Sequence, residues 1–200
     1  HVNLDKELTV EENMEFAGRL YRMRRNEIAA AADRLLAFLG LDSVRGRVVQ
    51  GLSGGMKRKL MIAKALIHDP RYLFLDEPTV GIDPKARRDI WDFLHVQHKE
   101  GKTIVLTTHY IEEAQHLCDK VMLIDGGRIF REDTPEALIA QIGRFKVEYD
   151  TGERMEAEFF TDLSGAKARA GQLDVPCSVL PSTLEDVFFH YTSKEVEGWK

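Results

Sequence analysis

Cysteine is scarce in this sequence of 200 residues, which contains only Cys118 and Cys177. Two cysteines so far apart do not form the framework of a small disulfide-rich protein or of a zinc site. We therefore expect a reducing compartment. Long apolar runs are also missing, because stretches such as 72–75 and 121–124 are far shorter than the roughly 20 residues of a membrane-spanning helix. The sequence thus predicts a chain that does not cross a membrane.

An excess of positive charge is missing as well. Lys and Arg number 28 against 33 Asp and Glu, which gives a formal net charge of -5. No global basic field makes nucleic acid the default partner, and we expect no nucleic acid to bind. Apolar residues make up 44% and charged residues 30% of the chain. This balance is typical of a folded globular protein and excludes disorder.

The first third of the chain is predicted to be helical. Thr9 and Glu12 form a capping-box pattern at the start of a helix that we expect to reach about Arg24. Asn26 can cap a second helix, which Gly40 would end. Ser53 has the position of the N-cap of a third helix.

Helices and strands then alternate. Apolar runs at 72–75, 103–107 and 120–124 predict strands, the first two buried on both faces of a parallel sheet. Asp83 followed by Pro84 predicts the start of a helix, 111–117 a short helix, and Gly126-Gly127 a hairpin turn into 128–130. This order predicts an α/β layer fold.

The pattern changes after Thr134-Pro135, which begins another predicted helix. Two alternating segments, 145–149 and 155–159, precede a helix to about residue 172, an extended piece at 175–180, and a last helix capped at Ser182 or Thr183. We interpret this part as a small α+β appendage. The chain is thus divided into a helical region (1–70), an α/β region (71–133) and an accessory region (134–200).

Three short motifs carry candidate chemistry. Ser53-Gly54-Gly55 puts two glycines at a helix N-terminus, where backbone N–H groups and the helix dipole favour an anion; a capped helix with a flexible entry is the alternative. Asp76 and Glu77 end an apolar strand and, by alternation, should point to opposite faces. In a nucleoside triphosphatase the first can hold Mg²⁺ through water and the second can activate water, although carboxylates also simply mark solvated strand ends. His109 follows the next strand at the same edge, where it could contact a terminal phosphate or be structural.

Four short motifs, at residues 52–56, 75–79, 81–84 and 108–109, have the order and spacing found in the ATP-binding subunit of an ABC transporter. The chain resembles that family over about residues 4–132. The resemblance implies that ATP of a partner subunit is contacted by the signature residues Leu52, Ser53, Gly54, Gly55 and Met56. It also implies that Asp76 holds Mg²⁺, that Glu77 is the catalytic carboxylate, that Asp83 lies in the loop crossing the dimer interface, and that His109 is the switch histidine. The family more often has Gln at position 56.

The glycine-rich phosphate-binding loop, G-x-x-x-x-G-K-[ST], is absent from the sequence. Gly101-Lys102-Thr103 imitates its end, but Val96 replaces the first glycine. We therefore expect an incomplete P-loop ATPase domain, the C-terminal part of a subunit, with a helical subdomain and an α+β appendage. It should not hold ATP tightly alone, and its sheet strands should be poorly paired and prone to aggregation.

The tail at 182–188 resembles ATPases of ABC-2 exporters, and is equally compatible with a capped amphipathic helix that packs Leu184, Val187 and Phe188. The leading hypothesis is an ATP-hydrolysing exporter subunit, peripheral at the inner, cytoplasmic face of the membrane. Its expected partners are a second, identical nucleotide-binding subunit in a head-to-tail dimer, and transmembrane permeases. A soluble ABC-type ATPase acting on DNA or ribosomes, and a non-enzymatic regulatory or dimerising module, are the alternatives. The basic residues of the signature helix, Lys57, Arg58, Lys59 and Lys64, are interpreted as a solvated face.

Overall fold

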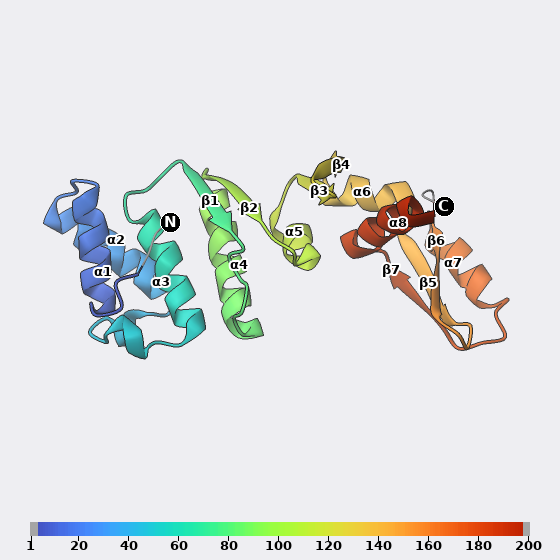
Figure 1. Ribbon diagram of the computed structural model, residues 1–200, viewed down its shortest axis with the longest axis horizontal. Coiled ribbons are helices and arrows are strands. Elements are labelled where there is room, and N and C mark those ends of the chain that lie inside the picture. Colours follow the sequence, from blue (N-terminus) through green and yellow to red (C-terminus); the bar gives the residue numbers. More distant parts are fainter. Residues whose placement is uncertain (1–3, 198–200) are drawn as a thin grey trace. The chain divides into compact units, whose positions relative to one another are not determined.

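The computed structural model describes residues 4–197, and the chain divides after His109 into two compact units (Figure 1). None of the helices in the described residues is both long and apolar enough to span a membrane. The three regions predicted from the sequence have other boundaries than these two units, and they stay a prediction. Residues 1–3 and 198–200 of those regions lie outside the described part of the chain.

Helices dominate the first unit. Its α-helices are α1 (Val10–Leu20), α2 (Arg25–Phe38), α3 (Gly54–Leu66) and α4 (Pro84–Lys99). Short 3₁₀ turns at Asp42–Val44 and Val49–Gly51 connect α2 to α3. The helices bury a shared apolar core whose members are Met14, Leu35, Leu36, Leu60, Leu66, Ile90, Phe93 and Leu94.

Capping residues set where these helices begin and end. The predicted capping box of α1 is confirmed: Glu12 N–H donates to Thr9 Oγ1 (3.2 Å) and Thr9 N–H to Glu12 Oε2 (2.8 Å). The predicted end at Arg24 is wrong, because α1 stops at Leu20 and Arg22 adopts a left-handed φ of 59°. The N-cap of α2 is Arg24 and not Asn26, since the Arg24 N–H donates to the Glu27 carboxylate.

The predicted parallel strands pair in the first unit. Strands β1 (Tyr72–Asp76) and β2 (Thr103–Thr107) are parallel, with Asp76 opposite Thr107. Their alternate side chains differ in burial: Leu73 is buried, whereas Tyr72, Phe74 and Val105 are 57%, 75% and 49% exposed. The prediction of burial on both faces is therefore wrong, because α4 lies against the pair (Figure 1) and within the described residues no second layer covers the other face.

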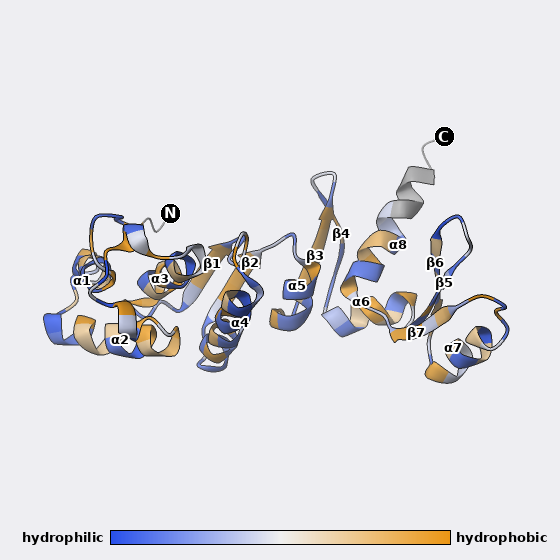
Figure 2. Cartoon of the chain, turned by 90° about the horizontal axis from the view of Figure 1, so that it is seen from below, coloured by the Kyte–Doolittle hydropathy of each residue, from blue (hydrophilic) through white to orange (hydrophobic). Residues whose placement is uncertain are grey.

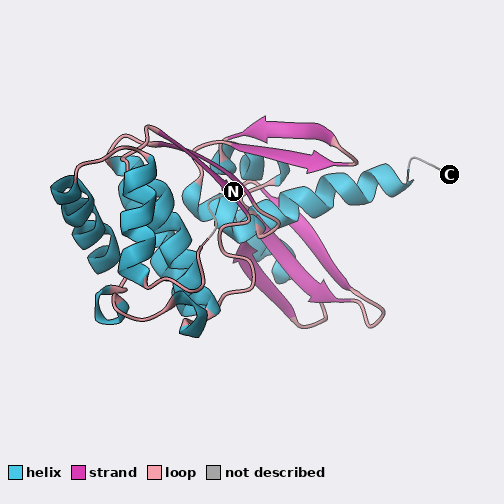
Figure 3. Cartoon of the chain, turned by 60° about the vertical axis from the view of Figure 1, so that its left-hand side comes forward, coloured by secondary structure: helices cyan, strands magenta, loops and turns pink. Residues whose placement is uncertain are grey.

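The second unit combines a hairpin with a three-stranded sheet, drawn in magenta in Figure 3. Strands β3 (Val121–Asp125) and β4 (Arg128–Asp133) pair antiparallel around Gly126 and Gly127, whose φ values are 53° and 76°. The antiparallel sheet has the order β6-β5-β7, with β5 (Phe145–Asp150), β6 (Met155–Phe160) and β7 (Cys177–Pro181). Its helices are α5 (Ile111–Leu117), α6 (Pro135–Ile142), α7 (Leu163–Ala170) and α8 (Leu184–Glu197).

One buried cluster fixes α8 in the second unit. Leu184 and Val187 are fully buried beside Val121, Leu123 and Leu138. Helix α8 begins after Thr183, whose hydroxyl accepts from Asp186 N–H (3.3 Å) while Thr183 N–H donates to Asp186 Oδ2 (2.7 Å). The packed face predicted for the tail is confirmed.

Candidate functional site

The signature residues lie at the start of α3. Ser53 is its N-cap, as predicted, and Ser53 Oγ accepts from the Met56 N–H (3.3 Å). Leu52 is buried beneath, while Ser53 and Gly54 are exposed. Among described residues, nothing lies within 4 Å of the place where a Cβ on Gly54 would stand. A helix N-terminus with accessible N–H groups fits an anionic phosphate oxygen.

Gly55 brings the signature helix against the start of α4. A Cβ at Gly55 would lie 2.8 Å from Ala86 Cβ and 3.4 Å from Asp83 Oδ2. Asp83 caps α4 by accepting from the Ala86 N–H (2.9 Å), and this hydrogen bond lowers the pKa of the Asp83 carboxyl. The structure therefore brings the predicted signature and the predicted interface loop into direct contact.

The remaining predicted residues meet at the carboxyl ends of β1 and β2. Asp76 Oδ1 accepts from Thr107 Oγ1 (2.5 Å), and Glu77 Oε2 lies 2.9 Å from His109 Nδ1 and 3.4 Å from the His109 backbone nitrogen. The Glu77 side chain is 36% and the His109 side chain 61% exposed, so both are accessible to solvent. Open α/β sheets bind ligands at this edge.

A turn, and not strand alternation, separates the two carboxylates. Strand β1 ends at Asp76, and Glu77 adopts a left-handed φ of 48°. The argument that both are strand residues facing opposite sides is therefore wrong. Their different partners follow from the turn, since Glu77 N–H donates to Thr107 O (3.0 Å) and its side chain reaches His109.

The contact between Glu77 and His109 restricts the proton on the imidazole. An ionised carboxylate only accepts hydrogen bonds, so Nδ1 of His109 must carry the proton that Glu77 accepts. Nε2 is then an acceptor unless the ring takes a second proton.

The side-chain oxygens at the end of β1 decide whether Mg²⁺ could bind there. Carboxylate oxygens are the ligands that Mg²⁺ prefers, and Asp76 provides one at an exposed strand end. Within residues 4–197 no group of three or more His, Cys, Asp or Glu side chains could hold a metal. The exposed Asp76 carboxylate therefore fits Mg²⁺ held through a water molecule.

The sequence suggested that the four basic residues of α3 form a solvated face. Lys57 fits that prediction, because its contact with Gln50 O (3.0 Å) is exposed, but the other three residues do not. Lys64 is 6% exposed, and its Nζ donates to Asn13 Oδ1 (3.3 Å). Lys59 Nζ pairs with Asp89 Oδ2 of α4 (2.6 Å). Arg58 donates to backbone carbonyls of the turn after β1. Helical spacing alone could not reveal the Arg58 contact, because its acceptors are backbone atoms 18 to 20 residues away.

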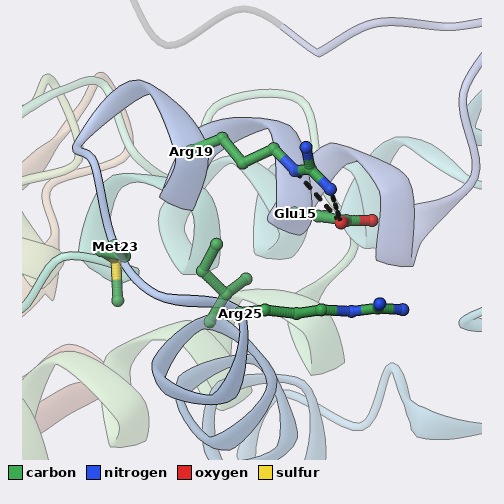
Figure 4. A pocket seen from close by; sticks show the side chains of 5 residues that line it. Glu15, Arg19, Met23 and Arg25 are labelled. Carbon is green, nitrogen blue, oxygen red and sulfur yellow. Dashed lines mark hydrogen bonds and ion pairs between the residues drawn. The ribbon is translucent and has the colours of Figure 1, made fainter.

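A cavity of about 260 Å³ lies elsewhere in the first unit. It is lined by Glu15, Arg19, Met23, Arg25 and Ile28 (Figure 4). Within it, Arg19 Nη2 pairs with Glu15 Oε1 (2.5 Å). None of the predicted site residues lines this cavity.

Comparisons with known proteins decide the family. The family described as "ABC transporter" matches residues 1–80. The chain is 41% identical to the Nod factor export ATP-binding protein I of Rhizobium johnstonii, an alignment that covers 98% of this chain and 70% of the relative. It is 39% identical to the protein of the same name from Rhizobium meliloti, covering 98% and 64%. This chain belongs to the ATP-binding subunits of ABC transporters.

Solved structures agree with that assignment. The chain matches the "Structure of ATP binding subunit of ABC transporter" with a TM-score of 0.61 and 29% identity, over 70% of this chain and 58% of that one. The α/β fold class expected for an incomplete ABC ATPase domain is thereby confirmed. The relatives above are named as ATP-binding proteins of Nod factor export.

Proposed function

We propose that this chain forms part of the ATP-hydrolysing subunit of an ABC-2-type exporter. The observation that carries the proposal is the contact between Glu77 Oε2 and His109 Nδ1 (2.9 Å) beside Asp76, at the carboxyl ends of paired parallel strands. Relatives named for Nod factor export, and the tail motif at 182–188, support export; no cargo is assigned.

In the proposed reaction, Glu77 orients the attacking water and takes its proton. An exposed carboxylate held by one neighbouring imidazole can accept a proton from water that lies in line with a γ-phosphate. His109 holds the Glu77 carboxylate and responds to the γ-phosphate. Mg²⁺, with Asp76 as a ligand through water, would neutralise charge on the phosphates.

The proposed assembly is a head-to-tail homodimer. Ser53, Gly54 and Gly55, flanked by Leu52 and Met56, would contact the ATP held by the partner subunit, and Asp83 would cross between subunits. The accessible N-terminus of α3 supports this role. A phosphate-binding loop, absent from these 200 residues, would have to come from sequence outside them. Permease subunits would hold the pair at the inner face of the membrane.

The first prediction concerns Glu77→Gln in the full-length protein. This change keeps the size and hydrogen-bonding reach of the side chain but removes its basicity, so turnover of Mg-ATP should fall by about a hundredfold or more. Binding of Mg-ATP, measured by calorimetry, should stay as in the wild type. Glu153→Gln, in the exposed turn between β5 and β6, is the matched control and should hydrolyse normally. Normal turnover in Glu77→Gln would contradict the proposed role.

A further inference from the structure

Arg58 links the signature helix to the turn that carries Glu77. Its Nε donates to Pro78 O (2.6 Å), and its Nη2 donates to Asp76 O (2.7 Å) and to Glu77 O. Three consecutive carbonyl groups thus converge on one guanidinium. The side chain reaches them from α3 and is itself half-buried.

The turn has a conformation that needs such support. Glu77 adopts a φ of 48°, a left-handed geometry that side chains other than glycine, asparagine and aspartate rarely take. After β1 the chain leaves the sheet. Glu77 N–H still donates to Thr107 O (3.0 Å), and Glu77 O accepts from Val80 N–H (3.4 Å) within the turn. Convergent carbonyl dipoles repel one another, and a planar cation with several N–H donors compensates this repulsion.

The backbone at Glu77 decides where its carboxylate points. With this φ, Oε2 reaches His109 Nδ1 at 2.9 Å. We propose that Arg58 is a positioning residue, which holds the backbone of 76–78 so that Glu77 faces His109. The inference rests on the proposed function for the role of Glu77 itself.

Arg58 also connects the turn after β1 to the N-terminus of α3. Arg58 lies one helical turn after Gly54, and the N-terminus of α3 is the part proposed to contact ATP of the partner subunit. Because a helix is stiff over one turn, a shift of that N-terminus moves the guanidinium and the turn that it holds. On the proposed function, contact with the partner's nucleotide would then reach the carboxylate that serves this subunit's own nucleotide.

The test compares Arg58→Gln and Arg58→Lys with Lys59→Gln in the full-length protein. Lys59→Gln is the matched control: it removes a positive charge from the same helix and breaks the α3–α4 ion pair with Asp89 (2.6 Å), but leaves the turn untouched. We expect Arg58→Gln to lower kcat by about ten- to a hundredfold, as misorientation of a catalytic group does. KM for Mg-ATP should not change. Arg58→Lys, which keeps one cationic donor, should recover part of kcat, and Lys59→Gln should resemble the wild type.

A second readout does not depend on turnover. The ¹⁵N chemical shifts of the His109 ring should change in Arg58→Gln and not in Lys59→Gln, because only the first variant releases Glu77. The role of Arg58 would be overturned if Arg58→Gln and Lys59→Gln had the same kcat. It would also be overturned if the His109 shifts were unchanged in Arg58→Gln. If wild-type protein does not hydrolyse ATP, the proposed function fails, and the His109 shifts still decide the positioning role.

Discussion

Gly55 is the residue at which α3 comes closest to α4. A methyl group there would meet Ala86 Cβ at 2.8 Å, a position fixed by the backbone and unable to rotate away. Gly54, its neighbour, has open space around it within the described part of the chain. The two adjacent glycines therefore serve different purposes: Gly55 permits helix packing, and Gly54 leaves the helix N-terminus accessible.

We predict that Gly55→Ala destabilises the protein and Gly54→Ala does not. Overpacking of this kind costs about 1–3 kcal/mol, which exceeds the helix-propensity gain of alanine over glycine, about 1 kcal/mol. Gly54→Ala has no clash and should be neutral or slightly stabilising. Urea unfolding of both variants beside the wild type measures the difference. Equal unfolding free energies for the two variants would contradict the packing role of Gly55.

At the scale of single elements, an ion pair ties α7 to the sheet of the second unit. Arg169 of α7 makes a two-pronged contact with Glu158 of β6, with Nη2–Oε1 at 2.7 Å and Nε–Oε2 at 2.8 Å. Tyr149 of β5 also donates to Glu158 Oε1 (2.9 Å). The hydrogen bonds from Arg169, followed by the one from Tyr149, hold the pKa of the Glu158 carboxyl below its usual value of 4.5.

This lowered pKa predicts a dependence of stability on pH. The stabilisation is present above the ordinary pKa of a glutamate and is lost as pH falls through the lowered folded-state pKa, because the unfolded chain then binds the proton more tightly. Arg169→Gln should therefore flatten the fall in unfolding free energy between about pH 5 and pH 2. Lys167→Gln, exposed on the same helix, removes the same charge and should leave the slope unchanged. Chemical denaturation at several pH values gives both slopes, and parallel slopes would refute the assignment.

The elements themselves were largely predictable, and the errors have local causes. Ser53, Asp83 and Thr134 cap helices where the sequence predicted, because a side-chain oxygen just before a helix that accepts from the N–H three residues later is a strictly local signal. The end of α1 was missed because Arg22 adopts a left-handed conformation that no sequence rule assigns to arginine. The meeting of Glu77 with His109 was predictable in outline from the shared strand edge. The Arg58 contact was not, because it depends on the path of the turn in space.

At the scale of the whole molecule, the paired strands β1 and β2 present an apolar face to solvent. Tyr72 and Phe74 of β1 and Val105 of β2 carry this face, and the apolar character of both strands is visible in Figure 2. A contiguous apolar face beside open strand edges is a surface on which chains associate. The expected tendency of the 200-residue chain to aggregate, which stays a prediction, would thus have a defined origin.

The last prediction tests this origin with Phe74→Ser in the 200-residue chain. Phe74 is 75% exposed, so its replacement removes apolar surface without opening a cavity, and it should reduce both aggregation and binding of a hydrophobic dye. Phe189→Ser on α8 makes the same chemical change at a phenylalanine that is 56% exposed outside this face, and it should alter neither. Light scattering during slow heating measures the first property and dye fluorescence the second. If both variants reduce aggregation equally, exposed phenylalanine in general, and not the β1–β2 face, causes association; if only Phe74→Ser does, the face is the site at which chains meet.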